Sequence, residues 1–487
     1  MPLRFRLTPE PFKHGVKNRV KRHPNKNTAV KSGFLSRGNL LNSRQQTNRG
    51  TQSTNPIRRA MNEAASSSAE IAAMQNAAWR TAFDHAAKSS PFYREHFARA
   101  GISAGDKISL AEIARIPTID KTVVSENPEK FLCVPREQIV DIVTTSGSTG
   151  QPLVWQLTES DLERLARNEE LSFACAGLTA ADTVLLAVAM DRCFIAGLAY
   201  FLGLRKLGCA VVRVGPATPA MHFDMIRRVQ PTAVVSVPSF LAHLADKAAE
   251  AKFDLAGAGI RKAVCIGEAV RENDFSLNRA GRLVKKNWGA KVFSTYGVTE
   301  LAASLGECEA GLGGHLHPEL LFLEALDEAG NTVPDGEVGE LTATTFGVEA
   351  MPLIRYRTGD FAAIHRAPCR CGRNTPRIGP VVGRKNQKLK LKGTTVFPSA
   401  LKTILDATPE IASYAIIARR ENNLADAVEV KIACAGDAAK ISAALKERFQ
   451  GEAKVAPQIT AASAAEIEKL QLPDGARKRR YFVDLRD

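Results

Sequence analysis

Three short segments of the chain combine residue types that can hold a nucleotide. Residues 144–152, TTSGSTGQP, follow an apolar run, and their hydroxyl and backbone N–H groups can surround phosphate oxygens. Residues 296–300, YGVTE, supply an aromatic ring that can stack on a purine and a carboxylate that can hold Mg²⁺. Residues 356–360, YRTGD, end on an aspartate that can accept hydrogen bonds from both hydroxyls of a ribose.

Each segment also has a plainer interpretation. The first lacks the Gly-Lys-Ser/Thr ending of a Walker loop and is equally compatible with a flexible Ser/Gly connector. The second reads as a turn at a strand end with a solvated glutamate, and the third as a Gly-Asp turn. Their order and spacing along one chain are more specific than any segment alone.

A fourth set of residues could bind a metal. Cys308, His315, Cys369 and Cys371 form a C-x6-H … C-x-C pattern, whose thiolate and imidazole groups suit tetrahedral Zn²⁺. The C-x-C spacing is tighter than the usual C-x2–4-C, so buried or incidental cysteines remain an alternative. His317 competes with His315 for the same position.

The elements that must position these residues follow an α/β pattern. Between residues 138 and 300, short apolar runs alternate with helical stretches, which predicts a parallel sheet buried on both faces. We expect strands at 139–145, 183–190, 210–214, 232–237, 262–266 and 291–294. We expect helices at 194–206, 221–229 and 239–251, and an Ala-rich helical region from Met61 through Trp79 to His96.

The later part of the chain changes character. Residues 320–364 predict β structure, with strands at 339–345 and 353–357, and residues after about 385 predict a small α+β domain with a hairpin and a helix at 438–449. We therefore expect three parts: a basic disordered extension (1–60), a large domain with βαβ-type sheets (61–384) and a small mobile α+β domain (385–487).

The distribution of charge and the number of cysteines indicate which classes of partner and which cellular compartment to expect. Residues 1–60 hold fourteen Lys or Arg and one acid, so thirteen of the fifteen net positive charges lie there and the other 427 residues carry two. A basic tail on a nearly neutral body argues against a nucleic-acid partner. No apolar run is long enough for a membrane helix. Nine scattered cysteines predict a reducing, cytoplasmic setting. The extension itself is either dispensable, with Met61 as the natural start, or a mitochondrial-type targeting segment.

In their order and spacing, the three nucleotide segments resemble those of the adenylate-forming superfamily of acyl-CoA synthetases, peptide-synthetase adenylation domains and luciferases. The resemblance runs from about residue 80 to the C-terminus and is nearest to the phenylacetate–CoA ligase group. Further segments that carry it are SPFYR (90–94), IPTIDK (116–121), VPRE (134–137), GR (383–384), KG (392–393) and VFPS (396–399).

The resemblance implies a role for each candidate residue. The loop that grips the ATP β- and γ-phosphates consists of Thr145, Ser146, Gly147, Ser148, Thr149 and Gly150. The residues flanking adenine are Gly267, Glu268, Ala269, Tyr296 and Gly297. Thr299 contacts the α-phosphate, Glu300 binds Mg²⁺, and Asp360 holds the ribose with Arg384 nearby. Lys392 and Gly393 face the active site after the C-terminal domain swings. Some members of the phenylacetate–CoA ligase-like group carry the Cys/His arrangement with bound structural zinc.

Two positions depart from the family pattern. The hinge aspartate is replaced by Asn386, followed by Gln387 in place of a second acid. The C-terminal lysine that bridges acyl and phosphate oxygens is normally preceded by glycine, whereas here the matching stretch is GARKRR (475–480). Aligning the residues that come after this stretch, 483–486, selects Lys478 as the equivalent of the family's lysine. The alternative is that 477–480 is a solvated basic run without a catalytic role.

Together these features predict an ATP-dependent carboxylate–CoA ligase that forms an acyl-AMP and then an acyl-CoA thioester. ATP, Mg²⁺, CoA and structural Zn²⁺ are the implied cofactors, and a small carboxylic acid, preferably aromatic, is the implied substrate. The nearest alternative is the same adenylation with an amine, a carrier-protein thiol or a hydroxyl as acceptor. A non-catalytic nucleotide-binding or nucleic-acid-binding protein is the alternative from another class. The sequence leaves the oligomeric state undetermined, with a homodimer among the options.

Overall fold

The computed structural model describes residues 67–103, 105–145, 152–391, 394–422, 425–473 and 480–486. The basic extension, most of the phosphate loop, Lys392, Gly393 and Lys478 therefore lie outside the described residues. Within the ranges above, no helix combines the length and the apolar character that a membrane span requires.

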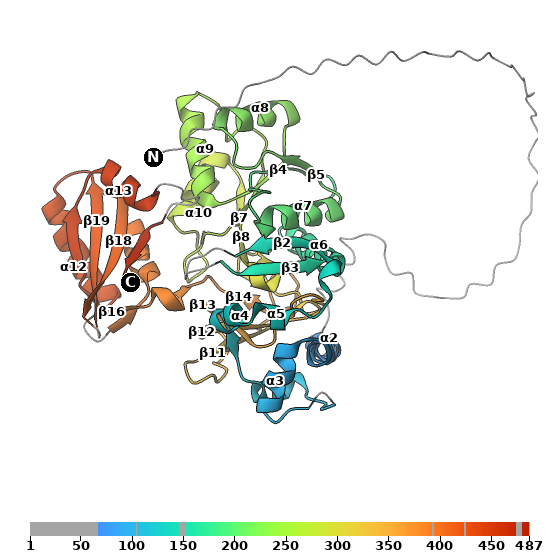
Figure 1. Cartoon of the computed structure of the whole chain (residues 1–487). Coiled ribbons are helices and arrows are strands. Elements are labelled where there is room, and N and C mark those ends of the chain that lie inside the picture. Colours follow the sequence, from blue (N-terminus) through green and yellow to red (C-terminus); the bar gives the residue numbers. More distant parts are fainter. Residues whose placement is uncertain are drawn as a thin grey trace, which may run out of the picture. The chain divides into compact units, whose positions relative to one another are not determined.

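A six-stranded sheet carries the βα rhythm that the sequence predicts (Figure 1). Its order is β5-β4-β6-β7-β8-β9, and every neighbouring pair is parallel except β8 and β9. The strands are β4 (Thr183–Leu186), β5 (Ala210–Arg213), β6 (Ala233–Ser236), β7 (Lys262–Ile266), β8 (Lys291–Val298) and β9 (Ala303–Gly306). The strand predicted at 291–294 is longer than expected because β8 continues through Tyr296 to pair with β9.

Both faces of this sheet are buried, as the continuous apolar strands predict. Along β4, Val184 and Leu186 pack into one hydrophobic cluster with α7, whereas Leu185 between them packs into another with α8, α9 and α10. Each buried branched side chain contributes about 1.5–3 kcal/mol to folding. The helices are α6 (Glu159–Cys175), α7 (Ile195–Leu207), α8 (Pro219–Val229), α9 (Pro238–Glu250) and α10 (Arg279–Trp288).

A second sheet has the order β10-β14-β13-β12-β11, and β1 and β15 also pair with β13. The strands are β1 (Ile119–Asp120), β10 (Gly314–His315), β11 (Leu321–Leu326), β12 (Val338–Thr345), β13 (Tyr356–His365), β14 (Arg377–Ile378) and β15 (Gly383–Arg384). The strand predicted at 353–357 is wrong in its placement. Arg355 has a left-handed φ of 51°, and its guanidinium forms a buried ion pair with Glu324, so the strand begins only after this turn.

The strand predicted at 139–145 does not join the parallel sheet. It is β2 (Ile139–Thr144), which forms an antiparallel two-stranded sheet with β3 (Val154–Thr158), a strand that the sequence analysis missed. The short connection at 145–153 explains this pairing, because parallel neighbours require a much longer crossover. The predicted phosphate-binding segment therefore falls, in the sequence, between two strands that pair with each other.

The predicted N-terminal helical region is two helices, α2 (Ser68–Ser89) and α3 (Pro91–Arg99). The break falls at Ser90, whose extended backbone is what a residue preceding proline favours. Trp79 on α2 is fully buried and its indole N–H donates to the Ile108 carbonyl at 2.8 Å. The following short helices are α4 (Lys121–Glu126) and α5 (Pro128–Phe131).

The C-terminal residues form a small α+β region with a hydrophobic cluster of its own, spanning Leu389 to Phe482. Its four-stranded sheet has the order β20-β19-β18-β21. The elements are β16 (Leu389–Leu391), β17 (Thr394–Val396), α11 (Pro398–Asp406), β18 (Ile411–Asn422), β19 (Ala425–Cys434), α12 (Ala438–Glu452), β20 (Gln458–Ala461), α13 (Ala464–Gln471) and β21 (Phe482–Leu485). The described residues fall within one compact unit, so the division at 384/385 stays a prediction.

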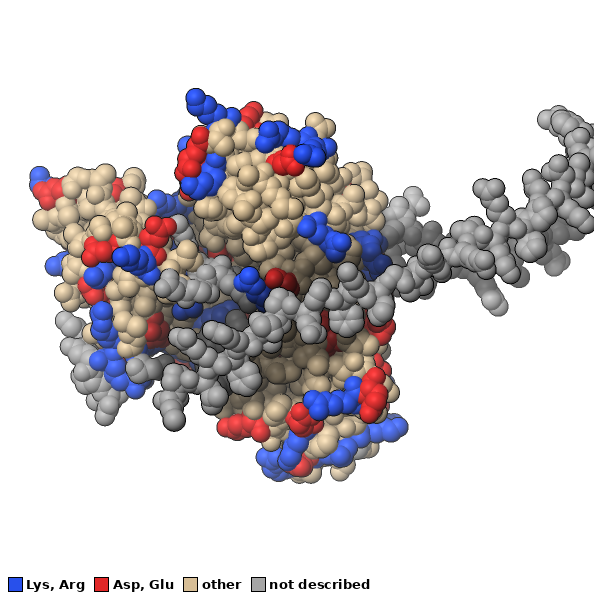
Figure 2. All heavy atoms as spheres, turned by 45° about the horizontal axis from the view of Figure 1, so that its top comes forward, with Lys and Arg blue, Asp and Glu red and all other residues tan. Residues whose placement is uncertain are grey.

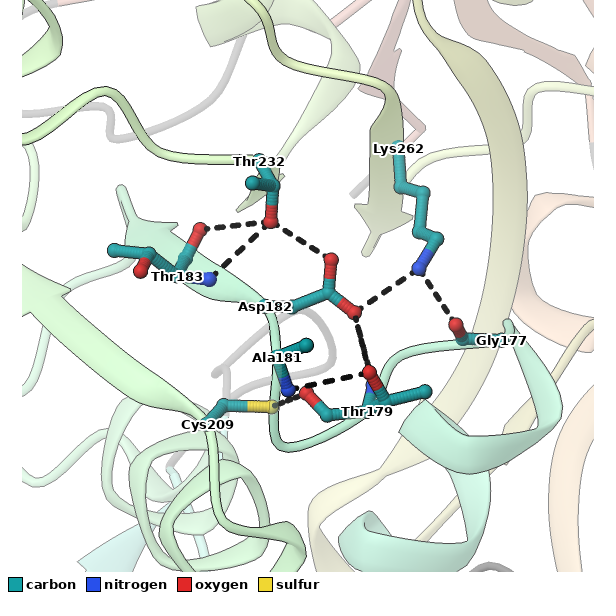
Figure 3. A network of polar contacts seen from close by, with 8 residues as sticks. All are labelled: Gly177, Thr179, Ala181, Asp182, Thr183, Cys209, Thr232 and Lys262. Carbon is teal, nitrogen blue, oxygen red and sulfur yellow. Dashed lines mark hydrogen bonds and ion pairs between the residues drawn. The ribbon is translucent and has the colours of Figure 1, made fainter.

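Charged side chains are mixed in sign on the surface. On the face in Figure 2, Lys and Arg are interspersed with Asp and Glu among the described residues. A separate buried network lies at the amino ends of the parallel strands, where Asp182 accepts hydrogen bonds from Thr179, Thr232 and Lys262 (Figure 3). This network ties the starts of β4, β6 and β7 together.

Candidate active site

The carboxyl ends of β7 and β8 bring together two of the predicted nucleotide-binding segments. Gly267 and Glu268 follow β7 directly, and Thr299 and Glu300 follow β8 in the 3-10 helix η3 (Thr299–Leu301). Because β7 and β8 are neighbouring parallel strands, both segments leave the sheet at one edge. Gly267 has a φ of 68°, which glycine adopts without strain, so the chain can turn sharply there.

Asp360 contacts two other predicted site residues. The Tyr296 hydroxyl donates to Asp360 Oδ2 at 3.0 Å, and Arg384 Nε donates to Oδ1 at 2.9 Å. The pairing of β13 with β15 places Asp360 opposite Arg384 in register. Burial raises the pKa of Asp360, against the opposing effects of the Arg384 charge and the two hydrogen bonds. Residues that the sequence assigned separately to adenine and ribose are therefore held in one cluster.

The Glu300 carboxylate is buried beside β13. The Tyr356 hydroxyl donates to Glu300 Oε1 over a long 3.4 Å, which leaves the carboxylate with capacity for a further ligand. Burial raises the pKa of Glu300, and the positive charge of Lys121 opposes this shift. A buried carboxylate with a perturbed pKa at a strand end marks a candidate functional group.

Lys121 is a site residue whose role the sequence analysis missed. The parallel pairing of β1 with β13 places Asp120 opposite Arg357, so Lys121 follows next to the nucleotide segments. Its Nζ donates to Thr145 Oγ1 at 3.2 Å, and that oxygen also accepts from the Leu153 N–H at 3.0 Å. The IPTIDK segment that carried the family resemblance was the available signal. Lys121 thus places a cation beside Thr145, the first residue of the predicted phosphate-binding segment.

The Glu268 side chain is engaged within the fold. Its carboxylate accepts from the Ser239 N–H at 3.0 Å and from the Ser239 hydroxyl at 2.6 Å. Ser239 lies in the first turn of α9, where an acidic group satisfies free backbone donors and complements the helix dipole. The backbone of residues 267–269 is therefore what can line an adenine site, while the Glu268 carboxylate caps a helix.

The turn after β4 is a second feature that the sequence did not indicate. Its Cys193 carbonyl accepts from the Thr144 N–H at 2.9 Å, which ties the turn to the residue before the phosphate loop. Arg192 and Cys193 both have left-handed φ values, 59° and 55°, and such strained residues cluster at functional sites. The turn also lies at the switch point where strand order reverses between β4 and β6, the usual position of ligands in open α/β sheets.

The four predicted metal ligands converge. Their ligand atoms all lie within 4.8 Å of one another. Cys308 Sγ and Cys369 Sγ are 3.7 Å apart, and Cys371 Sγ and His315 Nε2 are 3.5 Å apart. Tetrahedral zinc, with Zn–S of about 2.3 Å and Zn–N of about 2.0 Å, separates two sulfurs by about 3.8 Å and sulfur from nitrogen by about 3.5 Å. The donor set therefore fits zinc.

Groups around the four residues favour the protonation states of His315 and Cys371 that bind a metal. His315 Nδ1 is 2.8 Å from Thr375 Oγ1, which leaves Nε2 for a metal, and burial lowers the pKa of His315 toward the neutral ring. Burial opposes ionisation of Cys371, but hydrogen bonds from His315 and Arg373 outweigh it and lower the pKa. The rival His317 instead has its Nε2 3.0 Å from Ser172 Oγ. The geometry thus selects His315.

Comparison with known proteins decides the family. The sequence pattern of the family described as AMP-binding enzyme matches residues 57–349. A phenylacetate–coenzyme A ligase of Thermus thermophilus is 31% identical over 348 residues, covering 70% of this chain and 76% of the relative. The Escherichia coli enzyme of the same name is 28% identical, covering 74% and 82%.

The chain belongs to the AMP-binding enzyme family. Within it, the chain is an AMP-forming acid–thiol ligase of the phenylacetate–CoA ligase-like group, which works through an acyl-adenylate. The fold agrees: a 2-hydroxyisobutyryl-CoA ligase in the postadenylation state with its acyl-AMP superposes with a TM-score of 0.77 at 20% identity, covering 87% of this chain and 91% of that one.

Among the described residues of this AMP-binding enzyme, Tyr296 and Arg384 contact Asp360. Tyr356 contacts Glu300, and Lys121 contacts Thr145. Other predicted site residues lie outside the described ranges: Ser146, Gly147, Ser148, Thr149, Gly150, Lys392, Gly393 and Lys478. Their roles, and those of the described members, remain expectations that rest on the resemblance.

Proposed function

We propose that this AMP-binding enzyme activates a small aromatic carboxylic acid with ATP and transfers the acyl group to the thiol of CoA. The cluster of Tyr296, Asp360 and Arg384 beside the buried Glu300 carries the proposal, because it sets polar groups for a nucleotide at the carboxyl edge of the sheet. The names of the relatives support the acid and the acceptor.

In the first step, the substrate carboxylate oxygen attacks the α-phosphorus of ATP, giving acyl-AMP and pyrophosphate. Asp360 would orient the ribose by accepting its hydroxyl protons, and Thr299 would contact the α-phosphate. Lys121 and Thr145 lie together at the start of the phosphate loop, where a cation and a hydroxyl would hold phosphate oxygens. The protein's contribution is positioning and charge stabilisation, as in other phosphoryl and nucleotidyl transfers.

Magnesium fits the Glu300 carboxylate, an oxygen donor of the kind that hard cations prefer. When bound there, the ion would neutralise charge on the phosphate oxygens. Zinc fits Cys308, His315, Cys369 and Cys371 as a closed site without an open coordination position, and would therefore tie β10 to the loop of Cys369 rather than act in the reaction.

In the second step, the CoA thiolate attacks the acyl carbon and AMP leaves. We propose that the C-terminal domain, 385–487, rotates about the hinge at Asn386 between the steps, withdrawing Lys478 and presenting Lys392 and Gly393. Lys478→Ala should then abolish acyl-AMP formation while supplied acyl-AMP and CoA still give product. Equal loss of both half-reactions in a folded variant would exclude that role for Lys478.

The acceptor and the acid are tested by one experiment. A panel of aromatic, aliphatic and hydroxylated carboxylic acids is incubated with ATP and Mg²⁺, with and without CoA, and both pyrophosphate and thioester are measured. We expect aromatic acids to give pyrophosphate and a CoA-dependent thioester. Pyrophosphate release without thioester for every acid would favour an amine, carrier-protein thiol or hydroxyl as acceptor.

We also propose that the protein works in the cytoplasm. The nine cysteines are all free, as is typical of a reducing compartment.

A further inference from the structure

Arg164, a buried residue of α6, donates hydrogen bonds to four backbone carbonyls. The residue is 7% exposed. Its Nη1 donates to the Ala302 carbonyl at 2.8 Å and to the Leu301 carbonyl over a longer 3.4 Å. Its Nε donates to the Phe346 carbonyl at 2.6 Å, and its Nη2 donates to the Leu320 carbonyl at 2.7 Å. One side chain therefore connects α6 to segments that lie far apart in the sequence.

The hydrogen bonds of Arg164 differ from those of another buried arginine. The Nε and Nη2 of Arg355 donate to the two carboxylate oxygens of Glu324, whereas Arg164 donates to the backbone. Burial lowers the pKa of Arg164 to about 10, and the charges of Asp161 and Glu319 oppose this shift. The guanidinium is thus protonated at neutral pH, and burying its charge is unfavourable unless its hydrogen bonds are made. Arg164 therefore fixes the course of the chain at the carbonyls it contacts.

One of the contacted segments is the turn η3, which carries Thr299 and Glu300 and joins β8 to the antiparallel β9. Ala302, the residue after η3, has a left-handed φ of 43°, and its N–H donates to the Thr299 carbonyl at 3.0 Å. A residue other than glycine keeps this strained conformation only where its surroundings hold it. Carbonyls at the end of a helix lack partners within it, and an arginine can satisfy them. Arg164 therefore holds the backbone immediately after Glu300, at Leu301 and Ala302.

The other contacted segments lead to the sheet beside Glu300. Phe346 follows β12 directly, and its N–H donates at 2.9 Å to the Leu320 carbonyl, which also accepts from Arg164. β12 pairs with β13, whose first residue, Tyr356, donates to Glu300 Oε1. Arg164 is thus bound both to the turn that carries Glu300 and to the end of the strand that pairs with the strand of Tyr356.

We propose that Arg164 is a positioning residue, which holds Glu300 in the geometry at which its carboxylate binds Mg²⁺. This inference rests on the proposed function, in which Glu300 binds the ion. The guanidinium nitrogens form a rigid planar fork that can hold several carbonyls at once, whereas a lysine ammonium is a single charge on a flexible chain. Residues that orient a metal ligand without contacting the metal typically change metal affinity or activity by about 10–100-fold. Loss of the fork should therefore weaken the use of Mg²⁺ before it affects the KM for the acid.

The test measures acid-dependent pyrophosphate release against Mg²⁺ concentration on the full chain. Arg164→Lys keeps the charge but cannot reach all four carbonyls, so the Mg²⁺ concentration for half-maximal rate should rise by about 10-fold or more. Saturating Mg²⁺ should restore part of kcat, and the KM for the acid should change by less than about threefold. Asp182→Ala, which removes buried hydrogen bonds at the other end of the parallel strands, is the control for lost stability and should keep the wild-type Mg²⁺ dependence. A merely structural role for Arg164 would leave the Mg²⁺ dependence unchanged in both variants.

A double-variant cycle separates failure of this inference from failure of the proposed function. In the Glu300→Gln background, Arg164→Lys should reduce kcat by less than about threefold further, because its effect acts through Glu300. A normal Mg²⁺ dependence in Glu300→Gln itself would contradict the proposed function. Impaired Glu300→Gln combined with a normal Mg²⁺ dependence in Arg164→Lys, or losses that multiply in the double variant, would overturn the positioning role alone.

Ala302→Gly provides a second variant in case Arg164→Lys does not fold. Glycine adopts the left-handed φ without strain, so the fold should be retained, while the backbone next to Glu300 gains freedom. We expect the half-saturating Mg²⁺ concentration to rise in the same direction by about two- to threefold. In that case, an unchanged Mg²⁺ dependence in folded Ala302→Gly overturns the proposal.

Discussion

Buried carboxylates have different surroundings at the two edges of the parallel sheet, the amino edge where its parallel strands begin and the carboxyl edge where they end. At the amino edge, Asp182 accepts from Thr232 Oγ1 at 2.7 Å, from Lys262 Nζ at 3.0 Å and from the Thr179 N–H at 2.9 Å (Figure 3). Burial alone would raise the pKa of Asp182, but these hydrogen bonds and the Lys262 charge outweigh it and lower the pKa. The carboxylate oxygens of Asp182 are therefore occupied by hydrogen bonds from within the protein.

At the carboxyl edge, the Tyr356 hydroxyl donates to Glu300 over a long 3.4 Å, and burial raises the pKa of Glu300. Burial raises the pKa of Asp360 too, although Tyr296 and Arg384 contact it. A buried carboxylate with a raised pKa is unfavourable for the empty protein unless a ligand uses it. The comparison indicates that the amino edge holds the sheet together, and it supports our proposal that the nucleotide binds at the carboxyl edge.

The largest expected effect is on activity at the carboxyl edge. Glu300→Gln keeps the shape of the side chain but removes the charge that would hold Mg²⁺, so turnover should fall by about 10²–10³-fold. Acid-dependent pyrophosphate release measures this, with circular dichroism as the check on folding. Wild-type activity in Glu300→Gln would falsify the role assigned to this residue.

The matched change at the amino edge should affect stability instead. Asp182→Ala leaves the partly buried Lys262 without its anionic partner and removes the shorter acceptor of the Thr232 hydroxyl, which should reduce the free energy of unfolding by about 2–4 kcal/mol. At a temperature where the variant is folded, its turnover should stay within a factor of about three of wild type. Urea unfolding monitored by fluorescence gives the first quantity. A variant that is stable but inactive would contradict the division between the edges.

The metal set should prove structural. We expect about one zinc per chain, and a Cys369→Ser/Cys371→Ser double variant should lose the metal and unfold at lower temperature. Elemental analysis after washing with chelator measures the zinc content, and Cys434→Ser, outside the set, is the control. Full zinc retention in the double variant, or a zinc-free wild type, would exclude the site.

The smallest expected effect is a difference in pH dependence. Because the pKa values of Glu300 and Asp360 are raised, each side chain loses its ionised form at a higher pH than an ordinary residue of its type, so kcat/KM should fall first. Asp182 behaves oppositely: its lowered pKa contributes stability that is present above the ordinary aspartate value and is lost only as pH falls through the lowered pKa. Activity and unfolding measured over one acid titration should therefore separate, with activity lost first.

Much of this arrangement was predictable from local patterns. The apolar runs located β4 to β8, and the order of the three nucleotide segments identified the family. The metal set, including His315, was predicted from residue type and the family resemblance. The structure adds the reason against the rival His317, whose Nε2 lies 3.0 Å from Ser172 Oγ.

What the sequence could not indicate depends on contacts between distant segments. Lys121 reaches Thr145 only because β1 pairs with β13, a pairing without a local signature. The hairpin of β2 and β3 was mistaken for part of the parallel sheet, because a short apolar run does not reveal its partner. The capping role of Glu268 on α9 was likewise hidden, since it joins residues 29 positions apart.

The most direct test of the central claim is a single-turnover reaction with ATP, Mg²⁺ and the best acid of the panel, without CoA. Quenched samples are analysed by mass spectrometry for acyl-AMP. We predict accumulation of about one acyl-AMP per chain, with AMP and the thioester appearing when CoA is added. Formation of ADP in place of AMP, or no acyl-AMP with any acid while ATP binds normally, would contradict adenylation at this edge of the sheet.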